Sequence, residues 1–259
     1  MTEVMTAGAD QTGAAKTAAE TAAESTAESA AAQPAEIEAL EVTVTAPIAS
    51  FRNPLYSSVA LCLPCPPPAT VGGLLAAVAG GWEEVRPDLR FAMAFTAQAT
   101  GTDLETFHPL EQGGRWGQAV PRERAFLAGA VLTVWLTEEI DLWRRRFRRP
   151  VWPLRLGRSQ DLATARTRTV TLRKGEGVAG SALLPADATD RGTLLQLPTA
   201  ISRDRSRTRW DPYRHQRSVG GGRVSLDSTL GALVSGWVPP EGRAVRLLPP
   251  THPAVVEGA

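Results

Sequence analysis

Arginines that interleave with aromatic residues are the side chains in this sequence best suited to chemistry. Between residues 203 and 217, six arginines alternate with Trp210, Tyr213 and His215, and three glycines follow at 220–222. Guanidinium groups bind phosphates and aromatic rings stack on bases, a combination typical of flexible segments that bind single-stranded nucleic acid. We therefore predict such a loop, with plain disorder as the alternative. Its expected contacts are Arg207, Arg209, Trp210 and Arg214.

The charge distribution favours a polyanionic partner. The formal net charge is only +1, but residues 1–40 carry seven acids and one base, whereas residues 141–223 carry nineteen Arg or Lys against seven acids. A basic block of this kind is the electrostatic signature of nucleic-acid binding. Within it, the run Arg144 to Arg149 has a simpler interpretation as the solvated basic end of a helix, matched to the helix dipole.

Two motifs that resemble known sites lack the rest of their pattern. Cys62 and Cys65 form a C-x-x-C pair, but a structural zinc site needs two further ligands, so ordinary packing is the better interpretation. Residues 175–180 match G-x-G-x-x-G, but the long helix and the acid about twenty residues later that a dinucleotide site requires are missing. A hairpin turn is predicted there instead. We expect neither a metal nor a cofactor.

The histidines give little support for catalysis. His108, His215 and His252 are scattered, and no Ser/His/Asp signature accompanies them. One catalytic alternative stays open: metal-independent RNA cleavage, in which a Tyr, Lys or His deprotonates a ribose 2′-hydroxyl.

A proline-rich segment introduces the first predicted helix, from Thr70 to about Gly81. Pro66 to Pro68 keep the preceding backbone extended, and Thr70 is expected to cap the helix. Gly72 and Gly73 are placed in its first turn, where glycine lets a phosphate or another backbone approach exposed N–H groups.

Alternating and helical hydrophobic patterns define the order of the remaining elements. In chain order they are a strand from Leu40 to Phe51, the helix above, a strand from Leu89 to Ala97, a polar excursion from Thr100 to Arg124, a strand from Ala125 to Thr137, a helix from Glu138 that Pro150 stops, and a strand in either Val151–Leu156 or Thr167–Arg173. This β-α-β-β-α-β order predicts an α+β, ferredoxin-like fold over residues 39–173, with both helices on one face of an antiparallel sheet and the other face free for a ligand.

The flanking segments are predicted to differ from this core. Residues 1–38 are Ala-, Thr- and Glu-rich and cannot bury a core, which indicates a disordered acidic tail. Residues 174–238 are expected to form a small β-rich subdomain, and residues 239–259 a loosely packed Pro-rich tail. With no long apolar run and no secretory signal, we expect a cytoplasmic protein without membrane contact.

Four sequence blocks in fixed order resemble the fifth CRISPR-associated (Cas five) family of the RAMP superfamily. The blocks are the first strand with PIASFRNP (Pro47 to Pro54), PPPATVGGLLAAV (Pro66 to Val78), PRERAFLAGAVLTVWL (Pro121 to Leu136) and RPVWPLRLGRSQDL, which ends at Leu162. The resemblance spans roughly Leu40 to Leu172, and its pattern is closer to the type I-B style of subunit than to the type I-E style.

The resemblance implies a subunit of a type I Cascade complex that acts in antiviral defence. Such a subunit holds the repeat-derived 5′ handle of the guide crRNA, contacts the large subunit and the first Cas seven backbone subunit, and reaches target DNA only through the complex. The excursion Thr100 to Arg124 is the candidate for the family's thumb hairpin. The RNA contacts so predicted are Arg52, Gly72, Gly73, Arg122, Arg124, Arg155, Arg158 and Ser159.

One branch of the family, in type I-C systems, cleaves the repeat itself with Tyr, Lys and His. The position of its tyrosine is held here by Leu63, and Tyr56 lies seven residues earlier. The chain also has no Lys-His pair. We therefore predict a non-catalytic RNA binder, with the repeat-processing endoribonuclease and a generic protein-interaction module as alternatives. Arg122 and Arg124, two apart on a strand, are expected to matter more for RNA than the run from Arg144 to Arg149.

Overall fold

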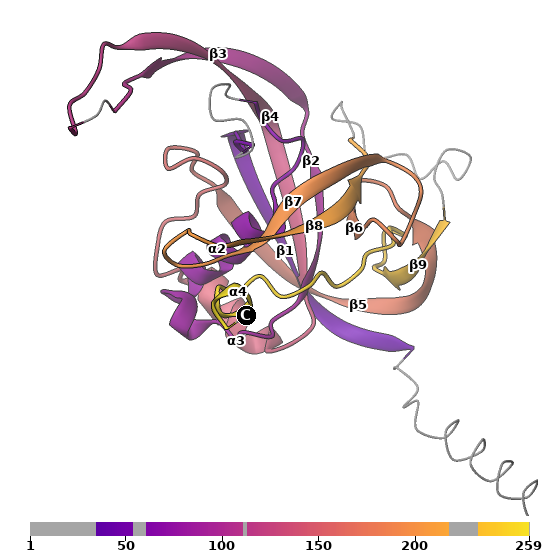
Figure 1. Ribbon diagram of the computed structural model, residues 1–259. Helices are drawn as coiled ribbons and strands as arrows, with labels where there is room; N and C mark the ends of the chain where they lie inside the picture. The colour runs from indigo at the N-terminus through magenta and orange to yellow at the C-terminus, as the bar shows by residue number, and fades with distance from the viewer. Residues whose placement is uncertain (1–34, 54–60, 111–112, 218–232, 259) are drawn as a thin grey trace, which may run out of the picture. The chain divides into compact units, whose positions relative to one another are not determined.

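The computed structural model describes residues 35–53, 61–110, 113–217 and 233–258. The described residues from Glu36 onward form one compact unit with a mixed α/β, strand-rich fold (Figure 1). Most of the acidic tail predicted for residues 1–38 lies outside the described residues, as do the glycines at 220–222. The tail prediction is wrong at its end, because strand β1 (Glu36–Ala49) begins inside it.

An antiparallel sheet forms the centre of this unit, and β1 lies in its middle. The strand order is β2 (Phe91–Thr96), β4 (Val120–Leu136), β1, β5 (Thr164–Val178) and β9 (Leu233–Val238). The predicted first and third strands pair directly, from Leu40 opposite Leu136 to Ala49 opposite Leu127. Because β5 extends to Val178 and pairs with β9, the boundary predicted between residues 173 and 174 falls inside a strand.

The predicted polar excursion forms a β-hairpin that rises from the sheet (Figure 1). Strand β3 (Ala99–Phe107) pairs with the first half of β4, from Ala99 opposite Ala128 to Phe107 opposite Val120. The second half of β4 pairs with β2. The change of partner coincides with Gly129, whose φ of +60° suits glycine, while the Gln98 N–H donates to the Ala128 carbonyl at 2.9 Å.

Helices α2 (Pro68–Ala79) and α3 (Ile140–Arg148) pack on one face of the sheet, as the hydrophobic pattern predicts. Alternate residues of β1, including Leu40, Val42 and Val44, face the same core as Trp143 and Phe147 of α3. A short 3-10 helix, η1 (Trp82–Glu84), follows α2. The helix start was misplaced: α2 begins after Pro67, and no side chain caps it, so Thr70 lies within the helix.

The opposite face of the sheet is not free along its whole length, contrary to the prediction. Trp135 of β4 and Leu172 of β5 are buried there against Val234, Ala244 and Val245. Further along the same face, β1, β4 and β5 border a hollow of about 540 Å³. The segment that covers the first part belongs to the chain's C-terminal region, which local sequence patterns did not connect to this sheet.

A second, three-stranded sheet follows in the chain. Its order is β6 (Leu183–Pro185), β8 (Thr208–His215) and β7 (Thr193–Ile201). It contacts the edge of the first sheet where Ala94 and Ala182 form a bridge, and β7 packs beside α2. The β-rich character predicted for this region is therefore observed, although β9 joins the central sheet.

The Pro-rich C-terminal segment is integrated into the fold rather than loosely packed. Leu248 is fully buried, and His252 Nε2 lies 3.0 Å from the Trp82 carbonyl oxygen. Thr251 packs so closely on α2 that a Cβ at Gly72 would overlap its side chain. The last helix, α4 (Ala254–Glu257), ends the described chain.

Candidate nucleic-acid interface

Four of the predicted arginines line one pocket. Its volume is about 220 Å³, and it lies where the end of β1, the outer half of the paired strands β3 and β4 and the loop after α3 meet. The lining residues are Ser50, Arg52, Glu105, Phe107, Arg122, Arg124 and Arg158. The sequence placed these arginines in three separate blocks, and the fold brings them together.

Gly157 allows the loop after α3 to reach the end of β1. Its φ is +103°, and a Cβ there would lie 2.6 Å from the Ser50 carbonyl oxygen, so only glycine fits without displacement. The Leu156 N–H donates to the Asp161 carbonyl at 2.9 Å, which closes the turn. The L-G-R-S block is therefore a tight turn that places Arg158 against the pocket.

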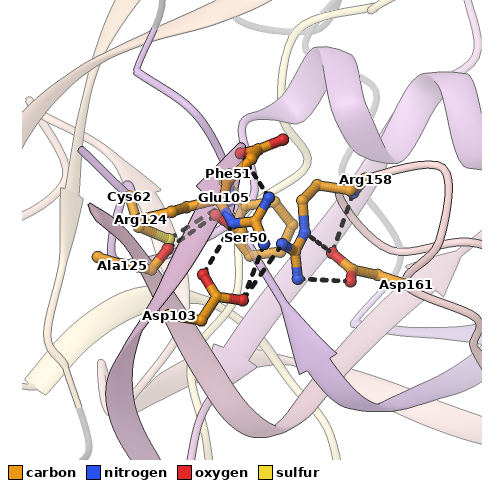
Figure 2. Close-up of polar contacts among 9 residues, drawn as sticks. All are labelled: Ser50, Phe51, Cys62, Asp103, Glu105, Arg124, Ala125, Arg158 and Asp161. Carbon is orange, nitrogen blue, oxygen red and sulfur yellow. Dashed lines mark hydrogen bonds and ion pairs between the residues drawn. The ribbon is translucent and has the colours of Figure 1, made fainter. Parts of the chain in front are cut away.

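Arg158 is held by a carboxylate three residues later. Its Nε and Nη2 donate to the two oxygens of Asp161, each at 2.8 Å, and the Asp161 carboxylate also accepts from the Arg158 backbone N–H (Figure 2). The third nitrogen, Nη1, has no hydrogen-bond partner among the described residues, and Asp103 lies 3.9 Å from it. The i, i+3 spacing of Arg158 and Asp161 is the signal in the sequence for this pair.

Arg124 is occupied by two acids of the neighbouring strand. Its Nε and Nη2 donate to Asp103 at 3.1 and 2.8 Å, and its Nη1 pairs with Glu105 at 2.5 Å (Figure 2). The hydrogen bond from Arg124 holds the pKa of Asp103 below its usual range. Only a tenth of the Arg124 side chain is exposed. In this structure Arg124 ties the two hairpin strands together, and none of its three nitrogens is left for a phosphate.

Arg122 and Arg52 are placed differently from Arg124. The Arg122 guanidinium lies over the ring of Phe107, 4.0 Å from its centroid, which orients the planar group toward the pocket. Arg52 follows β1 and is exposed. The prediction that Arg122 and Arg124 share one side of their strand is confirmed, since both line the pocket.

The other predicted contacts on the α2 side fall into two groups. Gly72 faces Thr251 and serves packing, so its expected approach to a phosphate is wrong. It is also the fifth helical residue, beyond the unpaired N–H groups of a helix start. Gly73, by contrast, has open space beside it and borders a second pocket with Arg155. Ser159 is exposed at the turn.

The Arg- and aromatic-rich segment is not the flexible loop that its composition predicts. The residues predicted to contact nucleic acid lie in strand β8 and in the turn before it. Arg209 pairs with Asp211, Arg214 donates to the Gly192 carbonyl, and Arg207 lies in the turn. Trp210 is half-buried on β8, and Tyr213 and His215 are buried. None of these residues lines the arginine pocket. The alternating pattern of β8 is hard to recognise in the sequence, because charged residues separate the rings that face inward.

Residues with catalytic potential are engaged elsewhere. Tyr213 shares a 2.7 Å hydrogen bond with Thr199, and burial raises the pKa of its phenol to about 12. Burial lowers the pKa of His215, whose Nε2 lies 3.2 Å from the Phe95 carbonyl oxygen. Tyr56 lies outside the described residues.

The cysteines pack as expected. Both are free thiols; Cys65 is fully buried, and Cys62 accepts from the Phe51 N–H at 3.3 Å. Burial raises the pKa of the Cys62 thiol. The G-x-G-x-x-G stretch was misread as a turn: Gly175 and Gly177 lie in β5, paired with β9, and only Gly180 lies in the turn that follows.

The comparison with protein families identifies the chain. It belongs to the CRISPR-associated protein (Cas_Cas5) family, whose model matches residues 39–223. This confirms the family that the four sequence blocks predicted. No curated protein matches the chain.

Two solved structures to which the chain is similar carry CRISPR descriptions. One, titled "CRISPR RNA-guided surveillance complex", is 16% identical over 80% of this chain and 93% of that chain, with a TM-score of 0.47. A second, a CRISPR protein from Archaeoglobus fulgidus, is 15% identical over 82% of this chain and 100% of that chain, with a TM-score of 0.42. Among the described residues, no helix is long and apolar enough to cross a membrane.

Proposed function

We propose that this chain is a non-catalytic RNA-binding subunit of a type I CRISPR effector complex and holds the 5′ handle of the guide RNA. The observation that carries the proposal is the pocket shared by Arg52, Arg122 and Arg158, beside the outer half of the β3–β4 hairpin. Guanidinium groups from three chain segments converge on one space, an arrangement suited to a bent phosphate backbone. Family membership supplies the biological setting.

The fold supports the RAMP assignment. Two β-α-β units interleave so that β5, β1, β4 and β2 are neighbours in that order, all antiparallel, and this order supports a ferredoxin-like domain. We take the β3–β4 hairpin as the thumb. The contacts with the large subunit and the first Cas seven subunit, the type I-B subtype and the indirect link to target DNA belong to this proposal through the family.

A binding role without cleavage is supported by the position of the groups that could act as a base. Cleavage without a metal needs a base within hydrogen-bond reach of the 2′-hydroxyl. His215, His252 and Tyr213 are turned into the protein interior, and His108 lies beside Trp116 near the hairpin tip. None of the four borders the arginine pocket.

The test measures the affinity of the full chain for fluorescein-labelled cognate repeat RNA by fluorescence anisotropy. The double substitution Arg52→Ala and Arg122→Ala is expected to weaken binding by about 10- to 100-fold, because each charge-assisted contact contributes about 1.5–3 kcal/mol before partial losses from coupling. It should also flatten the salt dependence, since fewer counterions are released.

The matched control is Arg173→Ala with Arg191→Ala. It removes the same charge from two side chains that are about three-quarters exposed and lie outside the pocket. Equal losses from the two double variants would overturn the pocket as the RNA site. Accumulation of a specific RNA product in the presence of EDTA would overturn the non-catalytic role and favour the endoribonuclease.

A further inference from the structure

A second surface of exposed arginines lies beyond the turn that holds Arg158. Residues 142–160 contain seven arginines and no acid. Three of them are engaged: Arg144 with Asp141 and Thr169, Arg146 with Glu84, and Arg158 with Asp161. By contrast, Arg148, Arg149 and Arg155 are exposed, and their side chains make no hydrogen bond or ion pair with any residue that the structure describes.

Trp152 lies in the middle of this arginine segment with its side chain in solvent. Its exposed fraction is 59%, and no aromatic ring in the described part of the chain pairs with it. Its backbone is nevertheless fixed, because the N–H groups of Val151 and Trp152 donate to the Val78 and Ala77 carbonyls of α2, each at 3.2 Å. A large ring on a fixed backbone loses little conformational entropy when it binds a flat partner.

A pocket opens beside this ring. It has a volume of about 360 Å³, at the lower end of the 300–1,000 Å³ found for ligand clefts. One wall is the α2 stripe of Thr70, Gly73 and Ala77, and the other includes Trp152 and Arg155. Gly73 has no side chain to fill this part of the pocket, and the space beside it is open, since nothing lies within 4 Å of where its Cβ would be. Arg155 is the one charged residue that borders the pocket.

We propose that this pocket is a second nucleic-acid subsite, in which one unpaired base stacks on Trp152 while Arg148, Arg149 and Arg155 contact the adjoining phosphates. The occupant is single-stranded nucleic acid because the segment is basic throughout, whereas a protein partner has no such uniform requirement. The subsite also adjoins the arginine pocket: Gly157 borders this pocket and contacts Ser50, which lines the other.

This inference rests on the proposed RNA-binding function and adds a base contact to it. One strand could run from the phosphates at Arg52 and Arg122 past the turn at Gly157 to the ring of Trp152. The arginine pocket then supplies charge, and the Trp152 subsite supplies stacking, which depends on the presence of a base rather than on its identity.

The test uses the full chain and two intact single-stranded probes, repeat RNA and DNA of the same sequence, together with two series in which a single abasic nucleotide replaces each position in turn. Trp152→Ala is expected to weaken binding of the intact probes about tenfold, and Trp152→Phe less than threefold, because a phenyl ring retains most of the stacking face. One abasic position should weaken the natural chain by a similar factor and leave Trp152→Ala unaffected.

Comparison of RNA and DNA separates two sources of the strand. A loss confined to RNA assigns the subsite to the guide, whereas equal losses assign it to any single strand that passes this surface. Unchanged affinity of Trp152→Ala for all probes would overturn the proposal, and so would equal losses in Trp152→Ala and Trp152→Phe without sensitivity to an abasic position.

The result is independent of the pocket test. If Arg52→Ala with Arg122→Ala loses RNA but Trp152→Ala does not, the subsite fails and the proposed function stands. If the reverse holds, the arginine pocket fails and the stacking subsite stands. Thermal unfolding of each variant checks folding; Trp152 is largely exposed, so its Tm should stay within about 2 °C of the natural chain.

Discussion

Two arginine-rich regions of this protein differ in how their charge is used. Beside the outer half of the β3–β4 hairpin, four arginines share the space with Asp103, Glu105 and Asp161, and two of the guanidiniums are bidentate to carboxylates. Around Trp152, three exposed arginines make no ion pair with the described residues. The first region is an ordered, nearly charge-balanced pocket, and the second is an open basic surface.

The difference shows that the number of arginines in a segment does not measure the charge available to a ligand. An arginine paired to carboxylates must exchange one anion for another when phosphate binds, and this exchange lowers the net gain. An exposed arginine without a carboxylate partner is less ordered before binding, but no carboxylate competes with the phosphate for it. We therefore expect the hairpin pocket to contribute selectivity and the Trp152 surface to contribute salt-sensitive affinity.

The largest effect is expected from Gly157, because it supports both regions. Gly157→Ala places a methyl group on a left-handed backbone and against the Ser50 carbonyl. We expect a loss of about 2–3 kcal/mol in the free energy of unfolding and a Tm lower by about 5 °C or more. RNA affinity should fall at both subsites, as anisotropy with intact and abasic probes would show.

Gly73→Ala is the matched glycine control for stability alone, because Gly73 borders the Trp152 pocket. Its Cβ meets nothing within 4 Å, and the residue lies inside α2, so alanine should stabilise the fold by about 0.5–1 kcal/mol. A Gly157→Ala variant with the Tm and RNA affinity of the natural chain would show that the turn does not couple the two regions.

A smaller effect of opposite sign is expected when the pocket's acids are neutralised. Asp103→Asn with Glu105→Gln frees Arg124 from two charged partners and removes repulsion toward phosphate. RNA affinity should rise about three- to tenfold at low salt, with a steeper dependence on salt. The double variant Asp187→Asn and Asp190→Asn, which changes the same net charge at exposed positions, should have little effect. Weaker RNA binding by the first variant would show instead that the acids orient the arginines for the ligand.

The smallest effect is expected at Glu241, outside both regions. Burial, followed by the nearby charge of Glu41, raises the pKa of this carboxyl group. The folded state therefore holds the proton more tightly than the unfolded state, and the resulting stability is lost as the pH rises above the ordinary glutamate range of about 4.3 toward the raised value. Glu241→Gln should flatten the Tm in that window and raise it by about 1–2 °C at neutral pH.

Asp103 should show the reverse dependence. Because Arg124 lowers its pKa, its stabilising contribution is present above the ordinary aspartate range and is lost as the pH falls through the lowered value. Thermal unfolding across pH 3–7 would compare Asp103→Asn with Glu241→Gln. For each variant, the difference in Tm from the natural chain is plotted against pH. Slopes of the same sign in these two plots would contradict the assignment of the two environments.

The sequence by itself determined the elements whose signal is local. Alternation along β1 and β4 predicted their shared inward face, and the stripe of Ile140, Trp143 and Phe147 predicted how α3 packs. The four sequence blocks determined the family. These signals survive in the sequence because strands and helices repeat over two or about 3.6 residues, whatever lies elsewhere in the chain.

Only the tertiary structure decided which charges are available and which surfaces are covered. Arg124 and Asp103 are 21 residues apart, Gly72 meets Thr251 far along the chain, and Tyr213 turns inward although Arg214 follows it. No local pattern encodes these contacts, since each depends on two distant segments folding against each other. The same composition of arginine and aromatic residues therefore became a packed strand at residues 208–215 and an open surface around Trp152.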